Sequence, residues 1–315
     1  MKSLFYKLIG VAIFVYLLGW IVDIGTLGAR VGSLRFSVLA LVIPFHLAQW
    51  TLRVLRWQML LRNESIPISF WENFAVATSG FFFGSLTPGR LGEFAKVKFL
   101  MNAGASFRGA FMSSFLERVM DIFALLFYVA AGILVCRDLM PEQAYYYFAM
   151  ALFLLAAPLG MYIYRKALLT LAMRMIPEKI AVDVEEKIHV CTRSFRNISP
   201  NQWAAMALYS LAIWGLNYWM IFLLFRGTGY SLSLYYAFAF AAFGSLAGLL
   251  PISIYGVGVR EAILMAFFSR AHYPDAVNAA VVFGLMFLVL LIYHIVLGFI
   301  GWMSPAMKRF LTRPV

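Results

Sequence analysis

Three short stretches of an otherwise apolar sequence combine charged side chains with helix-breaking residues or with the spacing of one helix face. They are Pro88-Gly89-Arg90-Leu91-Gly92-Glu93 with Lys96, then Glu117-Arg118 with Asp121, and then Pro251, Gly256 and Gly258 leading to Arg260 and Glu261. If the surrounding apolar segments lie in a membrane, each charge at its centre costs roughly 2.5–3.5 kcal/mol on insertion scales. Each charge therefore needs a partner inside the protein or a ligand.

Arg90 and Arg260 have the surroundings of anion-binding residues. A helix that begins at Pro88 presents free backbone N–H groups, and Arg90 in its first turn adds a planar fork that fits phosphate oxygens. Gly256 and Gly258 loosen the backbone before Arg260 in a similar way. Because a helix break and a cation coincide twice, we predict a substrate-binding site. Its candidate residues are Arg90, Arg260, Glu93, Glu261 and Lys96.

The middle stretch is typical of side chains that pair with one another. Glu117 and Asp121 are four residues apart and share a helix face, while Arg118 and Asp121 are three apart and can pair. We expect these three residues to act in ion coupling or as structural ion pairs. A structural role is also open for Arg90 and Arg260, as buried pairs with glutamates that hold helices together without a ligand. The two roles can coexist.

The segments that carry these charges are long and apolar enough to be membrane helices. Of 315 residues, 63% are hydrophobic and 13% are charged, whereas a soluble domain carries about 25% charged residues. A run of about twenty apolar residues crosses a hydrocarbon core ~30 Å thick. We expect six full crossings, at residues 4–22, 36–61, 109–135, 144–164, 203–225 and 277–303.

Two further apolar regions, 73–101 and 233–270, are interrupted by proline and glycine, and we predict a re-entrant helical hairpin in each. Such backbone is tolerated at membrane depth where it is packed in protein or lines a wet cavity. Segment length favours hairpins over two complete crossings, although charge parity alone allows both. The predicted breaks are Pro88, Gly89, Gly92, Pro251, Gly256 and Gly258.

The predicted elements occur twice, in opposite orientations. Phe74-Ala75 matches Phe238-Ala239 at an offset of 164, and Gly84-Ser85 matches Gly244-Ser245 at an offset of 160. Chance similarity between apolar segments is the alternative. We therefore predict an all-α polytopic membrane protein with six transmembrane helices and two re-entrant hairpins in two inverted repeats. Its parts are the first repeat (1–135), a connecting helix (144–164) with a cytoplasmic amphipathic segment (165–200) within 136–202, and the remainder of the second repeat (203–315).

The basic residues set the predicted orientation. With the N-terminus inside, sixteen Lys and Arg residues, Arg53 and Arg56 among them, lie on the cytoplasmic side and five lie outside, as the positive-inside rule requires. Both termini are then cytoplasmic, and we expect the chain in the cell (inner) membrane. Residues 165–200 are basic and amphipathic, so they form an interfacial helix or a solvated linker. Trp50 and Trp57 are expected as interface anchors.

The remaining composition argues against other classes of site. The net charge is +12, but the basic residues are spread over loops, so we expect no nucleic-acid partner. Cys136 and Cys191 have no metal or redox spacing, and the histidines form no ligand pattern. We expect no metal and no cofactor. No catalytic motif is present in the sequence, so we do not expect an enzyme.

Four motifs taken together resemble the lysylphosphatidylglycerol synthase transmembrane family, also called flippase-like integral membrane proteins. They are Leu55-Arg56-Trp57 with Leu60-Leu61, Thr87 to Glu93 with Lys96, Glu117-Arg118 with Asp121, and Leu250 to Ser253 through Gly256, Gly258, Arg260 and Glu261. The resemblance spans most of the chain and implies a helical membrane domain that moves a lipid or lipid-linked headgroup. Lysyl-transferring members carry a large soluble domain, whereas this chain ends at Val315, so we expect no aminoacyl transfer.

These observations favour a transporter of flippase type that moves an anionic phospholipid or a lipid-linked phosphate across the bilayer by alternating access. Its partners would be membrane lipids, anionic or linked to polyprenyl phosphate. Two alternatives remain at this stage. One is an integral membrane enzyme that acts on a lipid phosphate, and the other is an accessory subunit that does not transport.

Overall fold

The computed structural model describes residues 29, 32–85, 87, 92–140, 146, 150, 198–249 and 254–311. Within these residues the regular structure is helical, and four long helices form the frame. They are α3 (Phe36–Asn63), α6 (Phe107–Val135), α10 (Pro200–Gly227) and α13 (Ala276–Met303). All four are long and apolar enough to cross a membrane, as predicted. The predicted crossing 4–22, and nearly all of the predicted crossing 144–164 and of the segment 165–200, lie outside the described residues.

Local sequence explains where two of these helices begin. Ser199 and Gln202 form a reciprocal capping box at the start of α10, with Pro200 in its first turn. At the start of α6 the Ser106 hydroxyl accepts a hydrogen bond from the Gly109 N–H. At ~1.5 Å rise per residue, the 28 residues of α10 and the 29 of α6 make helices more than about 40 Å long, which allows tilt within a bilayer.

The two regions predicted to be hairpins each contain a pair of short helices. The first pair is α4 (Phe70–Ser85) and α5 (Ala95–Asn102), and the second is α11 (Leu234–Ala247) and α12 (Val259–Arg270), with a 3₁₀ turn at Ile254–Gly256 between them. Tyr255, Gly256 and Gly258 have positive φ angles of 56°, 79° and 87°, a conformation that glycine adopts without strain. The helix breaks therefore fall in the two predicted regions.

Each pair of short helices starts and ends at the same end of the molecule. Arg309, after α13, contacts Glu72 in the first turn of α4 at 3.3 Å. The next residue, Phe310, accepts a hydrogen bond through its carbonyl from Asn102 at the end of α5. At the opposite end, the Tyr273 hydroxyl after α12 donates to the Ser231 carbonyl before α11, at 2.7 Å.

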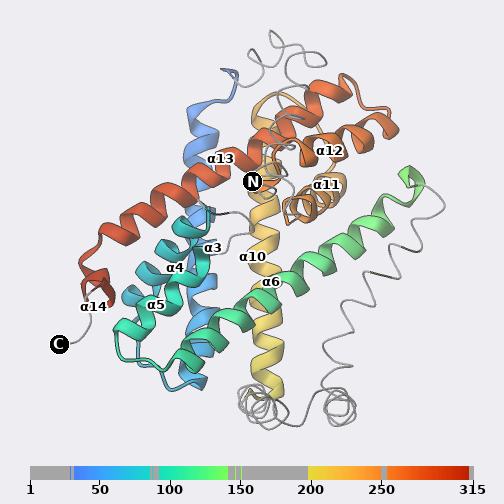
Figure 1. Ribbon diagram of the computed structural model, residues 1–315. Coiled ribbons are helices and arrows are strands. Elements are labelled where there is room, and N and C mark those ends of the chain that lie inside the picture. The colour runs from blue at the N-terminus through green and yellow to red at the C-terminus, as the bar shows by residue number, and fades with distance from the viewer. Residues whose placement is uncertain are drawn as a thin grey trace, which may run out of the picture.

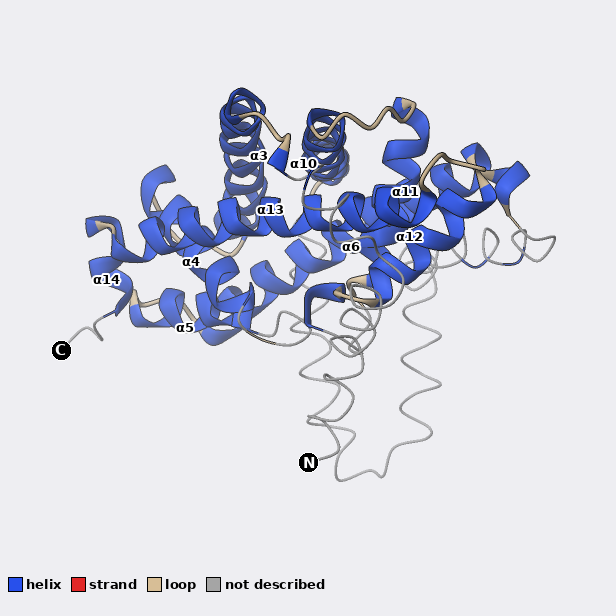
Figure 2. Ribbon diagram, turned by 90° about the horizontal axis from the view of Figure 1, so that it is seen from above, coloured by secondary structure: helices blue, strands red, loops and turns tan. Residues whose placement is uncertain are grey.

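The long helices pack in two crossed sets. In Figure 1, α3 and α10 stand side by side, and α13 crosses them to pack on α4 at one end and on α12 at the other. Helix α6 likewise contacts α5 and α11. Figure 2, which looks along α3 and α10, shows α6 and α13 running across the view. Buried apolar side chains form two clusters, one mainly around α4 and α5 and one mainly around α11, α12 and α13.

Two tryptophans lie in the first cluster and not where we expected them. Trp50 and Trp57 are 1% and 0% exposed, so the prediction that they anchor the protein at membrane interfaces is wrong. Both rings lie beside cations instead: the Arg53 guanidinium is 5.5 Å from the Trp50 ring, and the Lys96 amine is 4.6 Å from the Trp57 ring. Arg53 on the same helix and Lys96 on α5 thus form cation–π contacts with these buried rings.

Candidate functional site

Helix α6 presents the predicted acidic face to the interior of the protein. Glu117 and Asp121, one turn apart, are 2% and 5% exposed. Arg118 lies 3.1 Å from Asp121, the pairing predicted from their spacing, and 2.5 Å from Glu93 in the segment before α5. Glu93 is itself buried. The acids of α6 therefore face other elements of the protein and not lipid.

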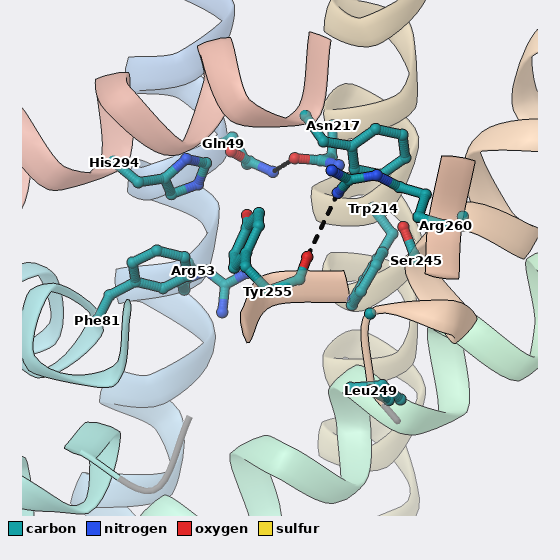
Figure 3. A pocket seen from close by; sticks show the side chains of 13 residues that line it. Gln49, Arg53, Phe81, Trp214, Asn217, Ser245, Leu249, Tyr255, Arg260 and His294 are labelled. Atoms are coloured by element: carbon teal, nitrogen blue, oxygen red, sulfur yellow. Dashed lines mark hydrogen bonds between the residues drawn. The ribbon is translucent and has the colours of Figure 1, made fainter. Parts of the chain in front are cut away.

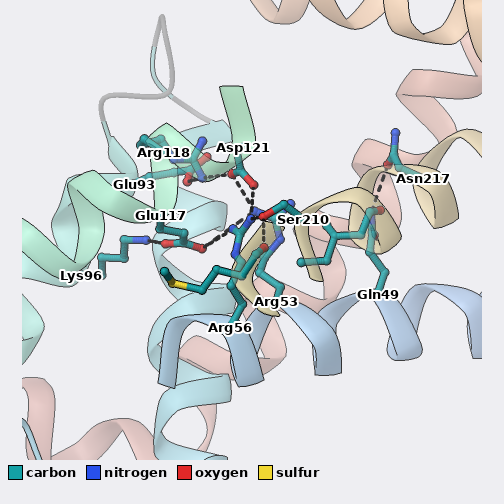
Figure 4. A network of polar contacts seen from close by, with 12 residues as sticks. Gln49, Arg53, Arg56, Glu93, Lys96, Glu117, Arg118, Asp121, Ser210 and Asn217 are labelled. Carbon is teal, nitrogen blue, oxygen red and sulfur yellow. Dashed lines mark hydrogen bonds and ion pairs between the residues drawn. The ribbon is translucent and has the colours of Figure 1, made fainter. Parts of the chain in front are cut away.

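Two arginines of α3 reach the same acids, as Figure 4 shows. Arg56 lies 2.9 Å from Asp121 and 3.5 Å from Glu117, and it donates to the Ser210 hydroxyl of α10 at 2.7 Å. Arg53 lies 3.2 Å from Asp121. Because Arg56 is fully buried, its charge depends on these acids for compensation.

The remaining cation of this group is Lys96, which pairs with Glu117. Helix α5 begins at Ala95, so Lys96 lies in its first turn. The prediction that Arg90 lies in the first turn of a half-helix beginning at Pro88 stays a prediction. Pro88, Gly89 and Arg90 themselves lie outside the described residues.

We call these seven side chains the ion network: Arg53, Arg56, Glu93, Lys96, Glu117, Arg118 and Asp121. Four cations meet three carboxylates, so the formal charge of the network is +1. It joins α3, α5, α6 and the segment that carries Glu93, and through Ser210 it also reaches α10. A network of this density holds α5 and the segment before it against the long helices.

The second predicted cluster is smaller and contains one ion pair. Arg260 and Glu261 lie in the first turn of α12, 1% and 0% exposed, with the Arg260 Nη2 atom 3.0 Å from Glu261. Glu261 also accepts a hydrogen bond from the Gly258 N–H at 2.6 Å. The Arg260 guanidinium lies 4.5 Å from the centre of the Phe287 ring. Glu261 thus holds the arginine in place, one of the roles considered from the sequence.

Arg260 and Arg53 line one cavity of about 70 Å³ between α3, α10, α11, α12 and α13. Figure 3 shows their side chains around it, together with Gln49, Asn217 and Ser245. We call it the central cavity. Its lining is completed by aromatic, apolar and small residues together with one histidine: Phe81, Trp214, Gly244, Gly248, Leu249, Tyr255, Phe287 and His294.

The chemistry of the central cavity fits an anion. Among its described lining residues are two arginines and no carboxylate. The buried Trp214 Nε1–H has no hydrogen-bond acceptor among the residues that the structure describes, although a buried donor normally has one. Two cations and an available N–H donor are the groups that bind a phosphate oxygen. An anionic group in the cavity would therefore find charge compensation and a hydrogen bond there.

The structure separates the predicted substrate residues into different places. Arg260 lines the central cavity and Glu261 supports it, whereas Glu93 and Lys96 belong to the ion network. Arg90 and Arg260 were predicted to belong to one substrate site; Arg90 lies outside the described residues, and the second arginine among the described lining residues is Arg53. Pro251, like Pro88 and Gly89, lies outside the described residues.

Gly92, one of the predicted helix breaks, lies very close to α4. A Cβ atom at this position would lie 2.2 Å from the Phe83 carbonyl oxygen of α4. Any side chain would therefore push the segment that carries Glu93 away from α4. Gly256 is equally confined, because its Cβ would lie 2.6 Å from the Gly248 Cα.

Sequence reasoning missed Arg53 and Arg56 as site residues. We counted both with the sixteen cytoplasmic basic residues, which is wrong because they are buried in α3; fourteen then remain against five outside. The signal that could have found them is an Arg-x-x-Arg spacing inside the predicted crossing 36–61. His46 and His294 were also missed: their rings meet with centroids 4.4 Å apart, although 248 positions separate them in sequence.

Comparison with known proteins gives one match. The family model described as lysylphosphatidylglycerol synthase TM region matches residues 7–299. No curated protein and no solved structure matches the chain.

Proposed function

The chain belongs to the lysylphosphatidylglycerol synthase TM region family, and from this premise we propose that it moves an anionic phospholipid or a lipid-linked phosphate across the bilayer by alternating access. The family and the four long apolar helices support a multi-pass membrane protein related to lipids. Transport, and not catalysis, is the specific proposal.

The observation that carries the proposal is the central cavity, where Arg53 and Arg260 meet with no carboxylate among the described lining residues. Each of these buried cations pairs with an acid that does not line the cavity, Arg53 with Asp121 and Arg260 with Glu261, and an anionic headgroup would add a partner on the cavity side. At about 70 Å³ the cavity holds little more than ordered water. A lipid phosphate therefore requires the helices around it to separate, which is the motion that alternating access supplies.

The packing supports two inverted repeats that could rock against each other. The order α3, α4, α5, α6 corresponds to α10, α11, α12, α13, and the contact of α13 with α4 corresponds to that of α6 with α11. Gly301 of α13 packs on Ala75 of α4, and Gly132 of α6 packs on Ala239 of α11. Ala75 and Ala239 are partners in the sequence repeat at offset 164. We propose six crossings and two re-entrant hairpins on this basis.

Arg53 gives the transport model a link between the substrate and the fold. It lines the central cavity and also pairs with Asp121 in the ion network. A headgroup that attracts Arg53 competes with Asp121 for it. Because the network joins α3 to α6 and α5, this competition would loosen one half of the protein when substrate arrives.

A lipid-transport assay tests the proposal directly. Purified protein reconstituted in vesicles should move NBD-labelled phosphatidylglycerol faster than NBD-labelled phosphatidylcholine, because only the first headgroup has a net negative charge. Arg260→Gln should lower the rate of phosphatidylglycerol transport by about tenfold or more, because a charge-assisted hydrogen bond is lost. Arg270→Gln is the matched control: it lies on the same helix, is exposed, and donates to the Leu139 carbonyl.

Several results would contradict the proposal. Equal transport rates for the two lipids would show that the protein does not recognise the charge of the headgroup. Equal effects of Arg260→Gln and Arg270→Gln would show that the central cavity is not the binding site. If wild-type protein moves neither lipid alone but does so with a co-purified partner, the accessory-subunit alternative is favoured.

Cysteine labelling tests the proposed topology, in which the termini are cytoplasmic. In a background without Cys136 and Cys191, Trp71→Cys and Phe107→Cys should both react with a membrane-impermeant maleimide from the cytoplasmic side, since both positions are exposed. Trp71 lies in the first turn of α4 and Phe107 follows α5, so reaction from opposite sides would make that pair a complete crossing. Tyr235→Cys, exposed at the start of α11, should react from the outside.

A further inference from the structure

Two buried histidines meet beside the central cavity. His46 of α3 and His294 of α13 are 3% and 4% exposed, and their ring planes lie nearly perpendicular at 86°. His294 lines the cavity itself. Its Nδ1 lies 2.7 Å from the Leu290 carbonyl oxygen, so that nitrogen carries a hydrogen in the neutral ring. Intramembrane ionisable side chains are rare and mark functional sites more often than soluble ones do.

The surroundings of this histidine pair are aromatic and cationic. Phe81 of α4 stacks on His294, with ring centroids 4.6 Å apart. The ring of Trp50, over which the Arg53 guanidinium lies, has its centroid 5.7 Å from that of His294. Among the described residues, the titratable or charged groups that face the pair are Arg53 from α3 and Tyr293 from α13. Across the cavity they are Tyr255 and Arg260, from the segment that leads into α12 and from α12 itself. None of these is an acid.

The buried carboxylates of the described residues are poorer proton carriers than the imidazoles. Glu93, Glu117, Asp121 and Glu261 each pair with at least one buried or partly buried cation. Protonation of any one would leave that cation without its partner, at a cost of several kcal/mol. A proton on an imidazole breaks no ion pair. It adds one positive charge to a cavity that already holds two, and this is opposed until an anion enters.

We propose that the His46–His294 pair takes up one proton when an anionic headgroup binds in the central cavity, so that proton and headgroup cross together. The inference rests on the proposed function and adds its coupling ion. The proton comes from hydronium or the acid form of the buffer in the aqueous phase, whose bond to it breaks as a bond to a ring nitrogen of the pair forms. By linkage, protonation must strengthen anion binding by the factor with which the anion strengthens protonation.

Isothermal titration calorimetry of wild-type protein in detergent measures this uptake without any transport step. The probe is dihexanoyl-phosphatidylglycerol, a phosphodiester that keeps one negative charge across the range used. Titrations at about pH 6.5, in two buffers that differ in ionisation enthalpy, should show uptake of up to about one proton per bound lipid. Affinity should fall about threefold or more between about pH 6 and about pH 8.

Variants assign the proton to the pair. The double variant His46→Gln/His294→Gln should bind the probe without proton uptake and with an affinity that does not change with pH. His272→Gln, at an exposed histidine between α12 and α13, should behave as wild type. Binding in wild type without proton uptake overturns this inference and leaves the proposed function standing. Uptake that persists in the double variant also overturns it, whereas failure of wild type to bind the probe contradicts both. The wild-type titration decides the matter even if the double variant does not fold.

Discussion

The pair Arg260 and Glu261 separates a ligand-binding role from a purely structural one. Arg260→Gln removes a guanidinium that is 1% exposed and leaves Glu261 with the Gly258 N–H as its remaining hydrogen-bond donor in the described structure. An uncompensated buried charge costs about 3–5 kcal/mol of the free energy of unfolding. The contact with Phe287 adds a cation–π loss of up to ~2 kcal/mol. The single variant should therefore unfold at a clearly lower temperature.

Stability should return in Arg260→Gln/Glu261→Gln. The amide side chain introduced at position 261 still has an oxygen to accept from the Gly258 N–H, and no charge is left unpaired, so we expect the double variant to be within ~2 kcal/mol of wild type. Binding of dihexanoyl-phosphatidylglycerol should not return. It should stay about tenfold to a hundredfold weaker in both variants, since the charge-assisted hydrogen bond is absent from both.

Thermal unfolding in detergent and calorimetric binding on the same preparations make the comparison. If binding recovers together with stability in the double variant, Arg260 is a structural residue that locks α12 in place. The central cavity would then not be the binding site of the headgroup.

Two further predictions concern the packing and the ion network. Gly301→Leu should lower the free energy of unfolding by about 1–3 kcal/mol, because its Cβ would meet the Thr78 hydroxyl and force α13 away from α4; Gly32→Leu, with open space around its Cβ, is the control, and equal unfolding temperatures would contradict the reasoning. Asp121→Asn should cost about 3–5 kcal/mol, since three arginines share this carboxylate. Glu72→Gln, which breaks the exposed pair with Arg309, should cost less than about 1 kcal/mol in the same thermal unfolding measurement.

The long helices could be predicted from the sequence because their signal is local. Runs of apolar residues gave 36–61, 109–135, 203–225 and 277–303, and the helices of the structure extend these by no more than three residues at either end. The helix breaks were also local, since proline and glycine determine backbone conformation where they stand. The pairing of Arg118 with Asp121 followed from helix periodicity alone.

The central cavity could not be predicted in the same way, because it depends on contacts between distant segments. Gln49 bonds to the Ile213 carbonyl, 164 positions away, and His46 meets His294 across 248 positions. Periodicity indicates which face of a helix is polar, but not which helix covers it. Arg53 was misplaced for this reason. In sequence, an arginine near the predicted edge of the membrane cannot be distinguished from a charge that flanks the membrane, and only its pairing with Asp121 of α6 shows that it is buried.

Asp121 belongs to the ion network and also holds Arg53, which lines the central cavity. Asp121→Asn should therefore affect lipid binding as well as stability, and in the opposite direction. Asp121 holds Arg53 at 3.2 Å, whereas Glu117 lies 4.0 Å from the same guanidinium. Without the Asp121 charge, the formal charge of the ion network changes from +1 to +2. Arg53 also loses its nearest acid and is held less tightly in the network. The variant should therefore bind dihexanoyl-phosphatidylglycerol about threefold to tenfold more tightly, an effect of ~1 kcal/mol for one unit of charge in a partly buried site. Lower stability combined with tighter binding is difficult to obtain from general misfolding, which weakens both. If binding weakens in proportion to stability, Arg53 belongs to the ion network alone, and the link between headgroup and fold fails.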